Sequence, residues 1–225
     1  DAIGNRQKTV NGLLPALPGT PNYTANALNQ DTAIGSLTPV YDTDGNMTAG
    51  PLPADVTANA TLTWDAENRL VSVTPVSGAM IYYSYDYLGR RISKQIGVAP
   101  ATRYIYDGWN IITEYTGTIL AKSYTWGMDL SGSMQGAGGV GGLLSVKEVS
   151  NLLTYYPTYD GNGNVSEYLD TAGAVVAHYE YDAFGNETVS TGGKKDDFAH
   201  RFSTKPLDAE TGLYYYGYRY YDPTT

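Results

Sequence analysis

The sequence predicts an all-β protein in which repeated β-hairpins join into one continuous antiparallel sheet that is curved or spiral. Three observations predict this fold class. Tyrosine is very frequent, at 22 residues against 3 Phe and 3 Trp, and its side chain favours strands with one packed face. Glycine, at 26 residues, can supply many tight turns. An aromatic-Asp pattern also recurs along the chain, and its copies must pair with one another because a lone hairpin is unstable in water.

The repeat is an aromatic residue followed by aspartate, with glycine or asparagine about three residues later. Trp64 supplies the aromatic residue in one copy, and tyrosine supplies it in the others. Successive aspartates are separated by 23, 21, 21, 53 and 22 residues, so the period is 21 to 23 with one longer interval. Such a period is typical of repeat proteins in which each unit is one supersecondary element. The aspartates that mark the copies are Asp42, Asp65, Asp86, Asp107, Asp160 and Asp182.

Each copy is expected to contain a strand, a turn and a second strand. In "IYYSYD" the alternation places Ile81, Tyr83 and Tyr85 on one strand face. The aspartate then begins a structural turn, because its carboxylate accepts hydrogen bonds from backbone N–H groups just ahead of it. A second strand rich in Val, Ile or Thr follows, as in "RLVSVTP". The glycines expected at the positive-φ turn positions are Gly45, Gly89, Gly163 and Gly185.

Two weaker copies precede Asp42. The opening "DAIGNR" fits the pattern without its tyrosine, and Asp1 lies 41 residues before Asp42, which is about two periods. The copy between them is the degenerate "YTANALNQ" at residues 23–30. A chain that begins within a repeat is interpreted as a fragment of a longer polypeptide.

The long interval contains a glycine-rich insertion at residues 127–142, where seven of sixteen residues are Gly. It includes a formal G-x-G-x-x-G pattern from Gly136 to Gly141, and Asp160 follows 19 residues later. A dinucleotide site needs this pattern between a strand and a helix. Here the next residues are typical of strand, turn and strand. We therefore expect a loop that binds no cofactor.

Residues 191–225 differ from the repeats. The stretch "DAETG" at 208–212 predicts a turn, and a strand of alternating tyrosines follows it. This strand is expected to be half-buried, with glycan binding by its aromatic face as the alternative. The tyrosines expected to share that face are Tyr214, Tyr216, Tyr218 and Tyr220.

Composition argues against several classes of protein. A net charge of -9 without a basic cluster disfavours nucleic acid as a partner, and no apolar run reaches the ~18 residues of a membrane span. The absence of cysteine removes disulfides and zinc-thiolate sites. The segments "DTDGN" and "DGNGN" lack the later ligands of a calcium loop, so no metal is expected. His178 and His200 have no nucleophile motif to serve and are expected to be structural or surface residues.

The Tyr-Asp copies resemble the YD repeats of Rhs proteins, and "RFSTKPLDAETGLYYYGYRYYDP" resembles the start of the Rhs-associated core domain. The resemblance spans essentially the whole chain. It implies a YD-repeat sheet over residues 1–190, with the insertion at 127–142, and a truncated core domain over residues 191–225. In this family the hairpins wind into a hollow shell that can hold a toxic C-terminal domain.

In many toxin relatives the core domain is an aspartate-dependent autoprotease, and its signature contains a second Asp-Pro that this sequence lacks. Asp222 matches the first Asp-Pro of that signature, and Arg219 precedes it. The resemblance therefore makes Asp222 and Arg219 the residues to test for self-cleavage of the full-length protein. The chain itself is expected to have no enzymatic activity.

We therefore expect a structural shell or scaffold segment of a large secreted or cell-surface bacterial protein. Its partner would be the rest of its own polypeptide, namely further YD repeats and a C-terminal cargo domain that the shell encloses or displays. Two alternatives remain. The chain is an extracellular assembly or adhesion module that pairs through open sheet edges into multimers or fibres, or it is part of an autoprocessing protease.

Overall fold

The computed structural model describes residues 23–225, which form nineteen β-strands and one short 3-10 helix. The initial copy "DAIGNR" lies outside the described residues. Fourteen strands form one sheet, called the wall below, in which each strand pairs antiparallel with its neighbours in sequence. These strands are β3 (Val40–Tyr41), β4 (Met47–Leu52), β5 (Asp55–Trp64), β6 (Leu70–Thr74), β7 (Ile81–Tyr85), β8 (Arg91–Ile96), β9 (Thr102–Asp107), β10 (Asn110–Thr116), β11 (Ile119–Trp126), β12 (Leu143–Glu148), β13 (Thr154–Tyr159), β14 (Val165–Leu169), β15 (Val175–Tyr181) and β16 (Glu187–Thr191).

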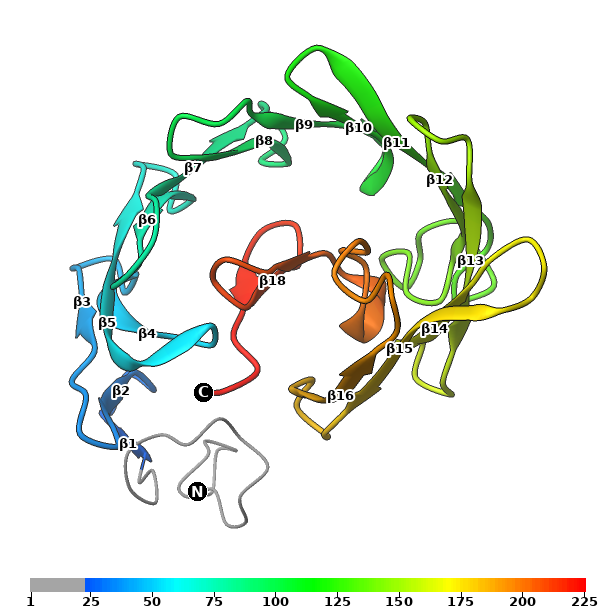
Figure 1. Cartoon of the computed structure of the whole chain (residues 1–225). Helices are drawn as coiled ribbons and strands as arrows, with labels where there is room; N and C mark the ends of the chain where they lie inside the picture. The colour runs from blue at the N-terminus through cyan, green and yellow to red at the C-terminus, as the bar shows by residue number, and fades with distance from the viewer. Residues whose placement is uncertain (1–22) are drawn as a thin grey trace.

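The wall curls into an arc, and the chain after β16 turns inward to lie in its hollow (Figure 1). This inner segment, residues 192–225, contains the 3-10 helix (Phe202–Thr204) and a small sheet. That sheet consists of β17 (Leu207–Asp208), β18 (Leu213–Tyr215) and β19 (Tyr220–Tyr221). A separate hairpin of β1 (Tyr23–Ala25) and β2 (Asp31–Ile34) lies beside one end of the arc (Figure 1). The predicted all-β, curved antiparallel sheet is confirmed.

Because consecutive strands are antiparallel neighbours, the connections alternate between the two rims of the wall. One rim, called the Asp-turn rim below, carries the connections that follow the repeat aromatic residues. The connections on this rim are residues 42–46, 65–69, 86–90, 108–109, 127–142, 160–164 and 182–186. The repeat period of the sequence is therefore one complete hairpin of the wall.

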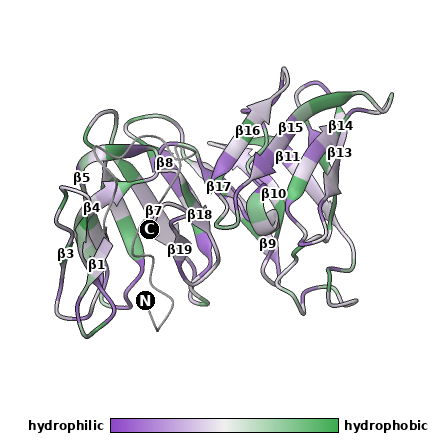
Figure 2. Ribbon diagram, turned by 90° about the horizontal axis from the view of Figure 1, so that it is seen from below, coloured by the Kyte–Doolittle hydropathy of each residue, from purple (hydrophilic) through white to green (hydrophobic). Residues whose placement is uncertain are grey.

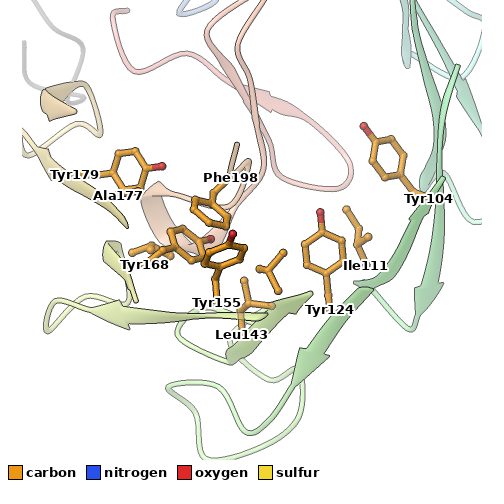
Figure 3. Packing of buried hydrophobic residues seen from close by; sticks show 11 residues of the cluster. Tyr104, Ile111, Tyr124, Leu143, Tyr155, Tyr168, Ala177, Tyr179 and Phe198 are labelled. Atoms are coloured by element: carbon orange, nitrogen blue, oxygen red, sulfur yellow. The ribbon is translucent and has the colours of Figure 1, made fainter. Parts of the chain in front are cut away.

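The inner face of the wall is the apolar face. In β7, Ile81 and Tyr83 are buried whereas Tyr82 is 44% exposed, as the alternation predicted. Bands of hydrophobic and hydrophilic residues alternate along the strands (Figure 2). Tyrosines from several strands project inward to surround Phe198 of the inner segment (Figure 3), and the rings of Tyr168 and Phe198 stack with centroids 3.8 Å apart. The inner segment thus completes a core that the wall alone cannot close.

The 53-residue interval contains one more hairpin of the wall, β11–β12. Trp126 takes the place of the repeat tyrosine, and residues 127–142 form its enlarged turn. The predicted strands after this loop are β12 and β13, and no helix follows the glycine pattern. Sequence inspection missed this copy because neither a Tyr-Asp nor a Trp-Asp pair marks it.

The predicted single strand of alternating tyrosines is wrong. The chain turns back between Tyr216 and Arg219, so β18 and β19 form a hairpin in which Tyr215 pairs with Tyr220. Gly217 adopts φ +84°, which a side chain would disfavour, and Tyr216 N donates to Arg219 O at 2.9 Å. Periodicity alone could not reveal this turn, because the tyrosine alternation continues through it.

Candidate functional site

Five predicted aspartates organise their turns in one way. Asp42 Oδ1 accepts hydrogen bonds from the backbone N–H groups two and four residues ahead, at 3.0 and 2.8 Å, and Oδ2 accepts from Asn46 Nδ2. The same three contacts recur at Asp65, Asp86, Asp160 and Asp182, with Arg or Asn in the last position. The residues with positive φ in these turns are Gly45, Asn68, Gly89, Gly163 and Gly185.

Asp107 has a different setting. Strand β9 continues through Asp107, which pairs with Asn110 across a two-residue turn at Gly108 and Trp109. Gly108 provides the positive φ, at +56°. Gln135 of the glycine-rich loop covers this turn by donating to Asp107 O and accepting from Trp109 N, at 2.8 and 2.9 Å.

Two turns of the same kind lack the aromatic-Asp signature. Asp170, which follows Leu169, accepts from Ala172 N and Ala174 N, both at 2.9 Å. In the degenerate copy at residues 23–30 Asn26 Oδ1 accepts from Leu28 N and Gln30 N in the same pattern. The signal that could have found Asp170 is its spacing to Gly173, which has φ +81°.

Six of the repeat aromatic residues are hydrogen-bonded through their side chains to the preceding hairpin. Tyr85 Oη donates to Leu70 O at 2.6 Å, and Trp126 Nε1 donates to Ile111 O at 2.7 Å. The carbonyl lies 15 to 17 residues earlier in every such bond. The other donors are Trp64 to Met47, Tyr106 to Arg91, Tyr159 to Leu143 and Tyr181 to Val165. This contact explains why the repeat uses Tyr or Trp rather than Phe.

In the first three of these turns the last residue also reaches the next turn along the Asp-turn rim, and Asn46 does so by donating to Asn68 Oδ1 at 2.8 Å. Arg69 Nη1 donates to Asp86 O, and Arg90 Nη1 donates to Gly108 O. The guanidinium groups of Arg69 and Arg90 each lie 5.3 Å above the repeat tyrosine of the next hairpin. These three turns are therefore anchored both within their own copies and to their neighbours, whereas Asn164 and Asn186 contact the inner segment.

Asp129, which no sequence motif marks, organises the glycine-rich loop. Its Oδ1 accepts from Ser131 N and Oγ, and its Oδ2 accepts from Ala137 N and Gly139 N. The hydrogen bond from the Ser131 hydroxyl, together with those from the backbone, lowers the pKa of Asp129 to about 2. The loop is thus a fixed structure with a carboxylate at its centre.

A buried ion cluster around Asp208 joins the wall to the inner segment. Asp208 pairs with Arg91 and with Lys94, the latter at 3.1 Å, and it accepts from Tyr83 Oη at 3.2 Å. Lys94 also pairs with Glu210 at 2.9 Å. Burial opposes ionisation of Asp208, but the charges of Arg91 and Lys94 outweigh it and hold the pKa of Asp208 below its usual value. The cluster therefore fastens β17 to β8.

His200 lies in the interior. It is 3% exposed, and its ring contacts those of Tyr124 and Trp126 on β11 edge-on, with centroids 5.0 and 5.5 Å away. Burial, with smaller contributions from Lys205 and Lys122, lowers its pKa to about 3. His200 is a neutral part of the core, whereas His178 lies on strand β15, partly exposed, beside Glu167 and Glu180.

The two residues that the resemblance suggests for self-cleavage do not form a site with each other. Asp222 Oδ1 accepts from Thr224 N and Oγ1 at 2.7 and 2.6 Å, so it organises the C-terminal turn. Arg219 is exposed on the turn between β18 and β19. Among residues 23–225 no ion pair joins Arg219 to Asp222. In the same range no group of three His, Asp or Glu side chains could hold a metal ion, and no helix is long and apolar enough to cross a membrane.

Known proteins share this architecture. A sequence model of the teneurin YD-shell family matches residues 24–225. The tRNA3(Ser)-specific nuclease WapA of Bacillus spizizenii is 34% identical over 229 residues, which cover 99% of this chain and 9% of WapA. The double-stranded DNA deaminase toxin A of Burkholderia cenocepacia is 28% identical over 81% of this chain and 14% of the toxin.

A chain in the solved structure of TcdB2-TccC3-Cdc42 has the same fold, with a TM-score of 0.67 at 22% identity. The alignment covers 93% of this chain and 11% of that chain. The chain thus spans about a tenth of the length of these relatives, and the activities in their names belong to much longer proteins.

Proposed function

This chain belongs to the Rhs and YD-repeat shell family, and we propose that it forms part of the wall, and the inward-turning end, of a closed protein shell. The observation that carries this proposal is the inner segment held in the hollow of the arc by the buried Arg91–Asp208 pair. A buried ion pair of this kind fixes one arrangement, because breaking it leaves a charge without a partner. The chain therefore turns inward after β16 at a defined place.

The length of the relatives supports a more specific proposal about the full-length protein. Because the chain matches only a small part of each relative, further repeats would complete the shell, and a C-terminal domain would be its cargo. The relatives are bacterial and carry toxin or nuclease names, which supports a secreted or cell-surface protein. The chain itself would be structural, without enzymatic activity of its own.

Protease protection of the longer polypeptide tests this proposal. In the wild-type protein the domain that follows the shell should resist a broad-specificity protease. Asp208→Asn should expose that domain to cleavage, because Arg91 loses its counter-ion in the interior. Asp196→Asn, which removes an exposed partner of Lys195, should leave the protection intact. If the protease cuts the following domain as rapidly in the wild type as in both variants, the domain lies outside the shell.

Edge-to-edge assembly is a second candidate, supported by one observation. In the described chain β3 and β16 each pair on one side only, so both ends of the wall present unpaired backbone groups. Multi-angle light scattering of the chain at increasing concentration tests this. Growth into multimers favours assembly, and a constant monomer mass argues against it.

Self-cleavage of the longer polypeptide is a third candidate, supported by the position of Asp208. This carboxylate is ionised in a water-poor interior and shares Lys94 with a second carboxylate, Glu210, and an ionised carboxylate can act as a nucleophile. Asp222 is instead engaged in its own turn. Asp208→Asn and Asp222→Asn in the longer polypeptide, compared on gels, should separate them, with Asp208→Asn blocking cleavage and Asp222→Asn retaining it. Loss of cleavage in Asp222→Asn alone would restore the assignment based on the resemblance.

A further inference from the structure

A cavity of about 220 Å³ lies between the Asp-turn rim of the wall and the inner segment. The wall contributes Trp109 and Trp126, and the inner segment contributes His200, Lys205, Tyr216 and Tyr218. We propose that this cavity is a binding site for a small aromatic carboxylate. The site is independent of the shell function proposed above.

The residues that line the cavity present aromatic faces to a planar ligand. Trp109 and Tyr218 are in contact across the wall and the inner segment, with ring centroids 4.5 Å apart. Trp126 Nε1 is already bonded to Ile111 O, so this indole offers only its apolar surface to the cavity. Aromatic rings gain from offset and edge-to-face contacts with other rings. An aromatic guest therefore suits these walls better than an aliphatic one of equal volume.

Lys205 supplies a positive charge without a matching negative one. Its Nζ donates to Gly138 O and lies 5.8 Å from the centre of the Tyr216 ring. Among residues 23–225 no carboxylate oxygen lies within 4.0 Å of this ammonium. Asp129 acts on it only through its charge at longer range, and both Asp129 oxygens already accept hydrogen bonds within the loop. Burial lowers the pKa of Lys205, because the ammonium group is partly removed from water. A carboxylate beside it would offset this desolvation cost.

The charge of the cavity selects a monoanion. Lys205 is the one residue of the lining that carries a formal charge, since His200 is held neutral by burial. The other lining residues are aromatic, aliphatic, glycine, Thr204 and Asn110, and the amide of Asn110 adds a neutral polar group. One cation among aromatic walls matches a ring that carries a single carboxylate.

The test compares benzoate with benzamide, which has the same shape and no charge. Titration of the chain followed by saturation-transfer NMR or calorimetry should show saturable benzoate binding and at least about tenfold weaker benzamide binding. Lys205→Met should reduce benzoate affinity to the level of benzamide. Lys195→Met, at an exposed lysine paired with Asp196, is the matched control and should bind benzoate as the wild type does.

Three results would overturn the proposal: equal affinities for benzoate and benzamide, unchanged benzoate binding by Lys205→Met, or no benzoate binding at millimolar concentration. If Lys205→Met unfolds, the wild-type comparison of the two ligands still decides. Trp109→Ala adds an independent variant, expected to lose binding because one ring of the site is removed. Repeating the titration with the longer polypeptide identifies the source of the carboxylate. Binding in both proteins indicates a free small molecule, and binding by the 225-residue chain alone indicates a carboxylate supplied by the polypeptide itself.

Discussion

Tyr23 donates its hydroxyl to the carbonyl of Thr224 at 2.8 Å, a contact between residues 201 positions apart. Asn186, in the turn that precedes β16, donates its side-chain amide to the neighbouring carbonyl of Pro223, also at 2.8 Å. The C-terminal tail therefore touches β1 near one end of the arc and the last turn at the other end (Figure 1). The two ends of the wall are joined through a segment that arrives last in the chain.

Tyr23→Phe removes one half of this junction without changing the shape of the ring. We expect a loss of about 1 kcal/mol in the free energy of unfolding, because the buried hydrogen bond between Tyr23 and Thr224 is removed. Urea denaturation measures it. Tyr82→Phe, at an exposed tyrosine of β7, is the control and should change stability by much less. Equal effects would mean that the junction contributes nothing specific.

Asp208→Asn should destabilise the fold severely, although it replaces only a carboxylate by an amide of the same shape. It leaves the buried Arg91 guanidinium without its counter-ion, and breaking such a pair typically costs about 3–5 kcal/mol. Asp196→Asn breaks an exposed pair and should cost at most about 1 kcal/mol. Urea denaturation of the two variants measures the contrast. Similar losses would show that the buried cluster is as weak as a surface pair.

Three glycines separate backbone strain from steric clash. At Gly185 φ is +89°, and an added Cβ would lie 2.6 Å from the Phe202 ring. At Gly78 φ is +99° with open space around it, and Gly161 has open space and no positive φ. Substitution by Ala should therefore cost most at Gly185, about 1 kcal/mol at Gly78 and almost nothing at Gly161. Thermal unfolding ranks the three, and a loss at Gly161 as large as at Gly185 would refute this explanation.

The sequence was sufficient to predict the hairpins that an aromatic-Asp pair marks, because each of these carries its own turn chemistry and strand alternation, but the β11–β12 hairpin and the turn at Asp170 lack that mark. It was insufficient where contacts are distant. Arg91 and Asp208 are 117 residues apart, and neither carries a local sign that it belongs to a buried cluster. Lys205 and Trp109 likewise come together only because the inner segment folds back against the wall. The prediction of a single strand of alternating tyrosines failed for the opposite reason. The alternation is a local pattern, and it continues through the turn that Gly217 forms.

Acid should weaken the fold through His200. The pKa of this histidine is about 3 in the folded state against 6.5 for the ordinary side chain, so the unfolded chain binds a proton between these values and the folded chain does not. The contribution of His200 to stability is therefore present above pH 6.5 and falls as the pH decreases toward 3, by roughly 1.4 kcal/mol per pH unit. The stabilising contribution of Asp208 is present above pH 3.8 and is lost only below it, because its pKa in the folded state lies below the usual 3.8.

Urea denaturation at pH 7 and pH 5 measures this slope, and we expect a loss of roughly 2 kcal/mol between them. His200→Phe keeps a ring of similar size between Tyr124 and Trp126 and removes the titrating group, so it should flatten the slope across that window. The charged groups that act on His200 are Lys205 and Lys122, and both lower its pKa. If His200→Phe and the wild type lose the same stability between pH 7 and pH 5, the acid sensitivity arises elsewhere in the chain.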